Sequence, residues 1–500
     1  MTRTAPLAMD AATFRSLGHQ LVDQLAASLA AIPDGPVTRD QSPSAVREAL
    51  ALNGPLPDAG TAPGPLLEET TRRLFQHSLF NAHPRFFGYI TSSPAPIGML
   101  GDLLAAALNA NVGAWTLSPA ATEIEAQTIR WIAEFIGYPA GCGGLIASGG
   151  NLANMIGVLA ARAAAAPWDV RAAGVAGGPG RRLRAYASAD AHTWLHKSAD
   201  TIGLGTDAIR WIPTDDRLRL DVAALAGQLE QDIAAGDIPA FVVGTAGSVG
   251  TGAIDPLGEI AALCRQHRVW FHVDGAYGAF AAALPDAPAD LKALALADSV
   301  ALDPHKWLYA PIEAGCVLVR DPERLRAAFA YHPPYYHFDE HATNYLDFGP
   351  QNSRGFKALK VWLALRHAGA AGYRAMIGDD IRLARTLADA VTRHPDLELT
   401  SQGLSITTFR YVPPDLRADV GTVAGERAID QVNRTLLDRL QREGEAFVSN
   451  AVIRGRYVLR ACVVNFHTTA ADIEALPGIV ARRGARVWAE QAAALMGSSS

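Results

Sequence analysis

Cysteine is scarce in this chain. Only four cysteines occur in 500 residues, at Cys142, Cys264, Cys316 and Cys462, and no two of them form a C-x-x-C pair. This wide spacing excludes a dense disulfide scaffold and a cysteine-rich zinc site. We therefore expect four reduced, mostly buried thiols, no bound metal and a cytoplasmic location.

Basic charge is not in excess either, and long apolar runs are missing. The chain carries 44 Lys and Arg against 50 Asp and Glu, which leaves a net charge of −6. Proteins that bind polyanions normally carry a basic excess or a basic stripe. The first residues lack the apolar core of a signal peptide, and no stretch is long and apolar enough to span a bilayer. We expect a large soluble globular protein without a nucleic-acid or membrane partner.

Hydrophobic periodicity divides the chain into four parts. Residues 1–99 contain an amphipathic helix over 12–32 and then stretches rich in proline and glycine, which indicates an arm that wraps a partner surface. Residues 100–394 alternate helical patterns with short β-branched runs, as in an α/β domain with a mainly parallel sheet flanked by helices. Residues 395–490 mix both patterns and predict a small α+β domain, and 491–500 form a tail.

Short apolar runs predict the strands of the α/β part. They lie at Leu183–Ala187, Phe241–Gly244, Val269–Val273, Ser299–Leu302 and Cys316–Val319. Helices are expected at 102–111, 119–137, 151–166, 222–235, 256–267 and 354–394. In sheets of this kind, sites form at the carboxyl ends of the strands.

Two such strand ends carry reactive groups. Lys306 follows one predicted strand in an apolar setting, where partial desolvation makes a neutral amine available for Schiff-base chemistry. Asp274 ends another strand, 32 residues earlier, and a carboxylate there can pair with a protonated pyridine nitrogen. A solvated lysine and a turn-capping aspartate are the alternatives that these short motifs leave open.

Two further segments complete a candidate site. Ser148-Gly149-Gly150 precedes a helical pattern, and free N–H groups at a helix start cradle phosphate. His192 can lie over a flat ring, although a lone histidine is more often structural. Together, a lysine, an aspartate, an anion cradle and a stacking histidine favour a phosphorylated pyridine aldehyde as the ligand.

At this point the sequence resembles the pyridoxal-phosphate-dependent amino-acid decarboxylases of group II, which are related to aromatic-L-amino-acid decarboxylase. The resemblance extends from the N-terminal helix to about residue 470. Its motifs are His83-Pro-Arg-Phe-Phe, Ser118-Pro-Ala-Ala-Thr-Glu, His272-Val-Asp274-Gly-Ala276-Tyr277 and Asp303-Pro-His305-Lys306-Trp307.

The resemblance implies a fold-type-I enzyme that holds pyridoxal 5′-phosphate (PLP) on Lys306 as an internal aldimine. The other contacts it implies are Asp274 at the pyridine nitrogen, His192 and Ala276 on the two ring faces, Ser148, Gly149 and His305 at the phosphate, and Thr245 near the ring hydroxyl. Asp303 stands where animal homologues carry asparagine near the phosphate. A carboxylate repels a phosphate, so it points elsewhere or is compensated by His305 and the backbone.

The resemblance also implies a homodimer with the site at the interface. The arm and the loop at 331–352 are the expected exchange elements. Tyr335 matches a loop tyrosine of the neighbouring subunit that protonates the reacting carbon, and the adjacent Tyr336 remains a second candidate.

A low-polarity pocket is expected from Tyr89, Ile90, Ser92, Val112 and Trp115, and such a lining favours an aromatic substrate. The same residues also fit a role in the core or at an interface.

The resulting hypothesis is PLP-dependent decarboxylation of an L-amino acid, preferably aromatic, to the amine and CO₂. The alternatives with the same fold are an aldehyde synthase, a decarboxylase of a non-aromatic amino acid, and an aminotransferase or carbon–carbon lyase. Loss of the loop tyrosine accompanies aldehyde synthesis in the family, so Tyr335 argues against the first of these. A catalytically silent binding protein is disfavoured because Lys306, Asp274 and His192 occur together.

Overall fold

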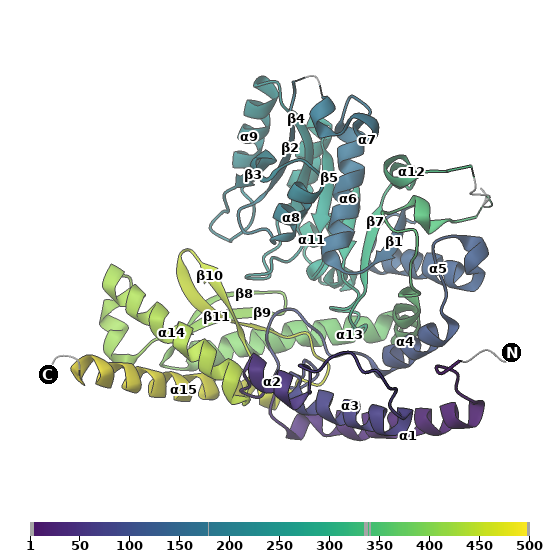
Figure 1. Cartoon of the computed structure of the whole chain (residues 1–500). Coiled ribbons are helices and arrows are strands. Elements are labelled where there is room, and N and C mark those ends of the chain that lie inside the picture. Colours follow the sequence, from purple (N-terminus) through teal and green to yellow (C-terminus); the bar gives the residue numbers. More distant parts are fainter. Residues whose placement is uncertain (1–4, 179, 335–338, 340–341, 498–500) are drawn as a thin grey trace.

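A computed structural model describes residues 5–178, 180–334, 339 and 342–497. Within this part of the chain, a seven-stranded sheet has the order β1-β7-β6-β5-β4-β2-β3 (Figure 1). Its strands are β1 Gly143–Ala147, β2 Leu183–Ser188, β3 Ile209–Ile212, β4 Ile238–Thr245, β5 Trp270–Asp274, β6 Ser299–Leu302 and β7 Gly315–Val319. Neighbouring strands are parallel except at β7, which runs antiparallel to both β1 and β6.

Helices cover both faces of this sheet. Successive side chains of a strand point to opposite faces, and because both sets are apolar here, both faces must be buried. On β2, Ala185 packs in one cluster with Val158 of α6, whereas the next residue, Tyr186, packs in another with Leu225 of α9. The flanking helices are α5 Pro119–Ile136, α6 Gly150–Ala165, α7 Val170–Ala173, α8 Trp194–Thr201, α9 Val222–Ala234, α10 Leu257–His267, α11 Ala289–Lys292 and α12 Glu323–Phe329.

A second, antiparallel sheet lies in the C-terminal part, with the order β10-β11-β9-β8. Its strands are β8 Leu397–Gly403, β9 Ile406–Tyr411, β10 Ser449–Ile453 and β11 Arg456–Cys462, and it packs with α14 Val423–Glu443 and α15 Ala470–Gly497. The long α13, Ala358–Arg393, runs beneath the large sheet and contacts the small one (Figure 1). The described fold therefore joins two sheets through one long helix.

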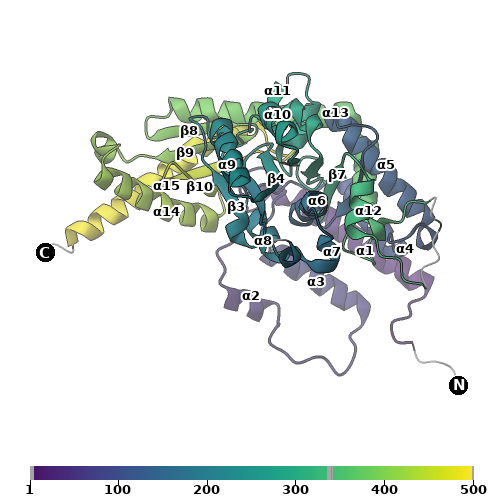
Figure 2. The same cartoon turned by 90° about the horizontal axis from the view of Figure 1, so that it is seen from above.

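The N-terminal segment packs loosely on the rest of the chain. It contains α1 Ala11–Ala30, α2 Pro43–Ala49, α3 Pro63–His77 and, closer to the large sheet, α4 Pro96–Leu108. Asp10 caps α1, yet no residue of α1 is buried. Helices α1 and α3 contact each other, and Figure 2 shows the chain around α2 looping away from the body. An arm of this kind leaves apolar side chains exposed.

The fold class expected from the sequence is confirmed, and the predicted strands lie within one or two residues of the observed ones, apart from β4, which begins earlier. Strands β1 and β3 of the large sheet were not predicted. Strand β1 was missed because it contains glycine, which weakens the sequence pattern of a strand. Glycine is required there, because a Cβ on Gly144 would lie 2.2 Å from the Val317 oxygen of the neighbouring strand. The helix predicted over 354–394 begins at Ala358 and is broken at Gly369, whose φ is +64°.

The boundaries of the four parts stay a prediction. All four cysteines are free, and three are buried. Among the described residues, no helix is long and apolar enough to cross a membrane.

Candidate active site

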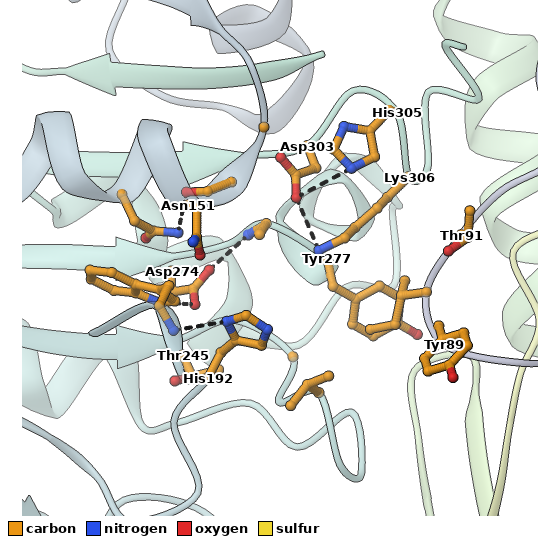
Figure 3. Close-up of a pocket in the computed structure, with 18 of the residues that line it drawn as sticks. Tyr89, Thr91, Asn151, His192, Thr245, Asp274, Tyr277, Asp303, His305 and Lys306 are labelled. Carbon is orange, nitrogen blue, oxygen red and sulfur yellow. Dashed lines mark hydrogen bonds and ion pairs between the residues drawn. The ribbon is translucent and has the colours of Figure 1, made fainter. Parts of the chain in front are cut away.

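A cavity of about 440 Å³ lies at the carboxyl ends of the large sheet's strands (Figure 3). The ends of β4, β5 and β6, the start of α6 and the turn before α8 form its sheet side. Tyr89, Ile90 and Thr91 form another wall together with Arg460 of β11. The cavity therefore draws on both sheets and on the chain between α3 and α4.

Lys306 projects into this cavity from a tight turn after β6. Its backbone N–H donates to the Asp303 carbonyl at 2.8 Å, which closes the turn. The side chains on its far side are fixed, because Trp307 and Tyr309 both donate to Asp380 Oδ2, at 3.0 and 2.6 Å. Lys306 Nζ lies 3.0 Å from Asp303 Oδ2. The amine is thus anchored at its base and is paired with a carboxylate at its tip.

Asp274 is buried at the end of β5, and both of its oxygens accept hydrogen bonds. Oδ2 accepts from Trp194 Nε1 at 2.7 Å, and Oδ1 accepts from the Ala276 N–H at 3.2 Å. His192 lies beside it, and burial lowers the pKa of the imidazole. The cavity therefore presents a carboxylate next to a neutral imidazole.

The turn from β1 into α6 needs glycine and leaves a helix start open. Gly149 has φ +129°, which a side chain disfavours, and a Cβ on Gly150 would lie 2.7 Å from Asp303 Oδ2. Among the residues that the structure describes, no side chain caps α6. The N–H groups of its first turn and the positive end of its dipole therefore point toward the cavity, which suits an anion.

Next to this anion cradle, His305 Nδ1 lies 2.7 Å from the Ala314 oxygen, while Nε2 lies 3.7 Å from Asp303 Oδ2. On the other side of the cavity, the Thr245 N–H donates to Asp255 Oδ2 at 2.7 Å. Burial raises the pKa of Asp255 to about 6. Asp255 therefore holds Thr245 in place from behind the cavity wall.

Arg460 is a buried cation on the wall formed by the small sheet. It is 4% exposed, its guanidinium donates to the Val249 oxygen, and its Nε has no hydrogen-bond partner among the described residues. Burial lowers the pKa of this guanidinium. Within the described part of the chain no carboxylate pairs with it, so it suits an anionic group of a ligand. Tyr89 stands nearby with φ +52°, and its N–H donates to Ser449 Oγ at 3.3 Å.

The structure brings most of the sequence-predicted residues to this cavity. Those that line it are Tyr89, Ile90, Gly149, His192, Thr245, Asp274, Ala276, His305 and Lys306. Ser148 directly precedes the lining residue Gly149.

Three residues expected in the substrate pocket do not line the cavity. Ser92 lies behind it and donates to the His305 oxygen at 2.7 Å. Val112 is fully buried in the main core. Trp115 donates from its indole to Glu123 at 2.9 Å. Tyr335 and Tyr336 lie outside the described residues.

Several lining residues were not identified from the sequence, chief among them Trp194, Asn154 and Arg460. Asn154 Oδ1 lies 2.8 Å from Nε2 of His272, which burial keeps neutral by lowering its pKa to about 4. Arg460 did leave a signal, because it is the one charge inside the apolar run from Tyr457 to Val464. A buried charge in a strand usually has a function or a partner.

This chain is similar in sequence and in fold to known proteins along most of its length. The family model described as the pyridoxal-dependent decarboxylase conserved domain matches residues 51–412. Aromatic-L-amino-acid decarboxylase of Bacillus atrophaeus is 32% identical over 93% of this chain and 94% of its own. Phenylacetaldehyde synthase of Arabidopsis thaliana is 27% identical over 91% and 92%. The crystal structure of Oryza sativa TDC with PLP and tryptamine has a TM-score of 0.88 at 28% identity, over 97% of this chain and 99% of its own.

The residues of the cavity fit PLP. The amine of Lys306 suits an aldehyde, and the carboxylate of Asp274, which accepts from Trp194, suits a protonated pyridine nitrogen. The start of α6, where the described residues provide no side-chain cap, suits a phosphate. Asp303 Oδ1 is buried beside the helix start without a hydrogen-bond partner among the described residues, and this carboxylate opposes a phosphate there. The chain belongs to the family of pyridoxal-dependent decarboxylases, and its cofactor is pyridoxal 5′-phosphate.

Proposed function

We propose that this enzyme decarboxylates an L-amino acid with an aromatic side chain, releasing CO₂ and the amine. The observation that carries the proposal is the lining of one cavity by Lys306, Asp274 and His192, with Tyr89 and Ile90 on the facing wall. The similarity to aromatic-L-amino-acid decarboxylase over 93% of the chain supports the aromatic substrate.

When bound, PLP supplies an electron sink for the pair of electrons that the departing carboxylate leaves on Cα. In the proposed site Lys306 would hold the aldehyde, and Asp274 would accept a hydrogen bond from the pyridine nitrogen. The start of α6, with Gly149 and His305, would hold the phosphate. His192 and Ala276 would support the ring, and Thr245 would hold its hydroxyl.

The substrate needs to be oriented as well as bound. Arg460, buried and without a carboxylate partner among the described residues, binds the substrate carboxylate. Tyr89 and Ile90 take the apolar side chain. Tyr335 or Tyr336, from the partner subunit, returns the proton to Cα.

A homodimer with the site at its interface is part of this proposal. Apolar side chains lie exposed along α1, α3 and α4, and α3 and α4 flank the Tyr89 wall in the chain. They include Phe14, Leu66, Leu74, Leu100, Leu103, Leu104 and Leu108. A second copy of the chain would cover such a surface, which is too apolar for water alone. Sedimentation equilibrium of the protein and of Leu104→Glu tests this, with a dimer expected for the first and a weaker dimer for the second.

The function is tested by supplying the purified protein with PLP and a panel of amino acids while CO₂ and amine are measured. We expect turnover of aromatic amino acids, its loss in Lys306→Ala, and full turnover in the exposed-lysine control Lys292→Ala. Full turnover and cofactor absorbance in Lys306→Ala would contradict the assignment.

Aldehyde synthesis is the second candidate, because phenylacetaldehyde synthase is similar over 91% of the chain. Formation of the aldehyde, ammonia and hydrogen peroxide in place of the amine, with consumption of O₂, would identify it.

A further inference from the structure

Trp194 makes an unusual pair of contacts at the cavity. It is the first residue of α8 and is only 2% exposed. Its indole Nε1 donates to Asp274 Oδ2 at 2.7 Å, and its backbone N–H donates to His192 Nδ1 at 3.2 Å. Figure 3 shows how His192 and Asp274 lie in the cavity, with dashed lines at both side chains. One residue thus touches both groups that face the proposed cofactor ring.

The indole bond decides how the Asp274 carboxylate is presented. An indole N–H donates and cannot accept, so it stabilises the carboxylate as an acceptor at Oδ2. The other oxygen has a longer bond, 3.2 Å from the Ala276 nitrogen. Rotation of the carboxylate would break the shorter of the two bonds. Asp274 is therefore held in one orientation, with lone pairs of Oδ1 left for a ligand in the cavity.

The backbone bond decides the proton position on His192. Nδ1 accepts from the Trp194 N–H, so in the neutral ring the proton is on Nε2. Burial lowers the pKa of His192 and keeps the ring neutral. A substitution at Trp194 removes the indole bond to Asp274 and leaves the backbone bond to His192, because every residue except proline retains the backbone N–H.

Trp194 is itself held in place. Its ring meets His272 edge to face, with centroids 5.9 Å apart and planes at 74°. His272 is fixed in turn by Ser299 Oγ at 2.7 Å and Asn154 Oδ1 at 2.8 Å. The indole N–H therefore reaches Asp274 from a rigid support, as a second layer around a site requires.

We propose that Trp194 is a positioning residue that orients the Asp274 carboxylate toward the ring nitrogen of the cofactor. This inference rests on the proposed function, because it assumes that Asp274 meets that nitrogen. Trp194 should therefore strengthen binding only of a cofactor that has the ring nitrogen.

The test compares two ligands on Trp194→Phe. One is PLP, and the other is its carbocyclic analogue, in which C–H replaces the ring nitrogen. Dissociation constants are measured by titrating cofactor-free protein and following the absorbance of the bound ligand. Trp488→Phe is the matched control, because Trp488 Nε1 also donates to a carboxylate, that of Asp415 at 3.0 Å, outside the cavity.

We expect Trp194→Phe to weaken PLP binding about tenfold, which equals about 1.4 kcal/mol, and to change binding of the analogue by less than about twofold. Trp488→Phe should leave both constants unchanged. Equal weakening of both ligands would overturn the proposal, since it would reveal a purely structural role. Unchanged binding of PLP would overturn it as well.

Two further results keep the outcome decisive. Thermal unfolding of the cofactor-free variants reports whether Trp194→Phe folds. If it does not, replacing the Trp194 indole with benzothiophene removes the N–H alone, and the same two constants decide. Failure of the unaltered protein to bind PLP would refute the proposed function itself, whereas normal PLP binding with an insensitive Trp194 refutes only this inference.

Discussion

Replacement of Asp303 should have opposite effects on the stability of the cofactor-free protein and on its affinity for PLP. The carboxylate is 3% exposed and sits beside Gly150 at the start of α6, where the phosphate is proposed to bind. Its Oδ2 lies 3.0 Å from Lys306 Nζ and 3.7 Å from His305 Nε2, and Oδ1 has no hydrogen-bond partner among the described residues. The perturbation is Asp303→Asn, which removes the charge and keeps the shape.

The two expected effects have opposite signs. At an effective dielectric constant of about 20, unit charges 3.0 Å apart attract by about 5.5 kcal/mol before desolvation is counted. Because Lys306 is partly exposed, a net loss of about 1–2 kcal/mol is expected in the cofactor-free protein. For 500 residues the unfolding entropy is about 1 kcal/mol per kelvin, so Tm falls by about 1–2 °C. PLP affinity should instead rise about tenfold, because an anion no longer faces the phosphate and Lys306 no longer has to leave its partner.

The assay is a pair of measurements on cofactor-free protein: Tm by calorimetry and the PLP dissociation constant by absorbance titration. Asp321→Asn, at an exposed carboxylate that pairs with Arg324, is the matched control and should change neither quantity. Weaker or unchanged PLP binding in Asp303→Asn would refute the reasoning, because it would place the carboxylate outside the phosphate's field. A rise in Tm would refute the view that the ion pair stabilises the empty site.

Three other predictions follow from buried charges. Burial raises the pKa of Asp380 to about 7. Between about pH 4 and 7 the folded chain therefore keeps a proton that the unfolded chain loses. The free energy of unfolding should fall by up to about 4 kcal/mol as the pH rises through this range. Asp380→Asn, which keeps an acceptor for Trp307, should flatten this dependence of Tm on pH, and an unchanged slope would contradict it. Arg354→Met strips Glu125, which is 0% exposed, of its partner at 2.5 Å and should cost about 3–5 kcal/mol by urea unfolding, much of it recovered with Glu125→Gln. Arg460→Gln should raise KM for the amino acid at least tenfold with unchanged PLP affinity, whereas an unchanged KM would remove Arg460 from substrate binding.

Local sequence signals predicted those elements whose structure depends only on the residues of one short segment. The α/β alternation predicted the sheet, because each strand buries its own apolar run. Glycines at 149 and 150 predicted the start of α6, because the turn excludes side chains there. The limits of these signals appear in β1, where Val317 of β7, a strand more than 160 residues away in the chain, requires glycine at position 144.

The sequence by itself determined the fold class and the family resemblance, and it led to the proposal of Lys306 and Asp274 as the reactive pair, since each depends on residue type and spacing along the chain. Only the tertiary structure decided which groups support them. Trp194 meets Asp274 across 80 residues, and Asn154 meets His272 across 118. Arg460 reaches the cavity from the second sheet. Hydrogen bonds depend on distance and direction in space, and chain folding sets both, so such partners leave little trace in the order of residues.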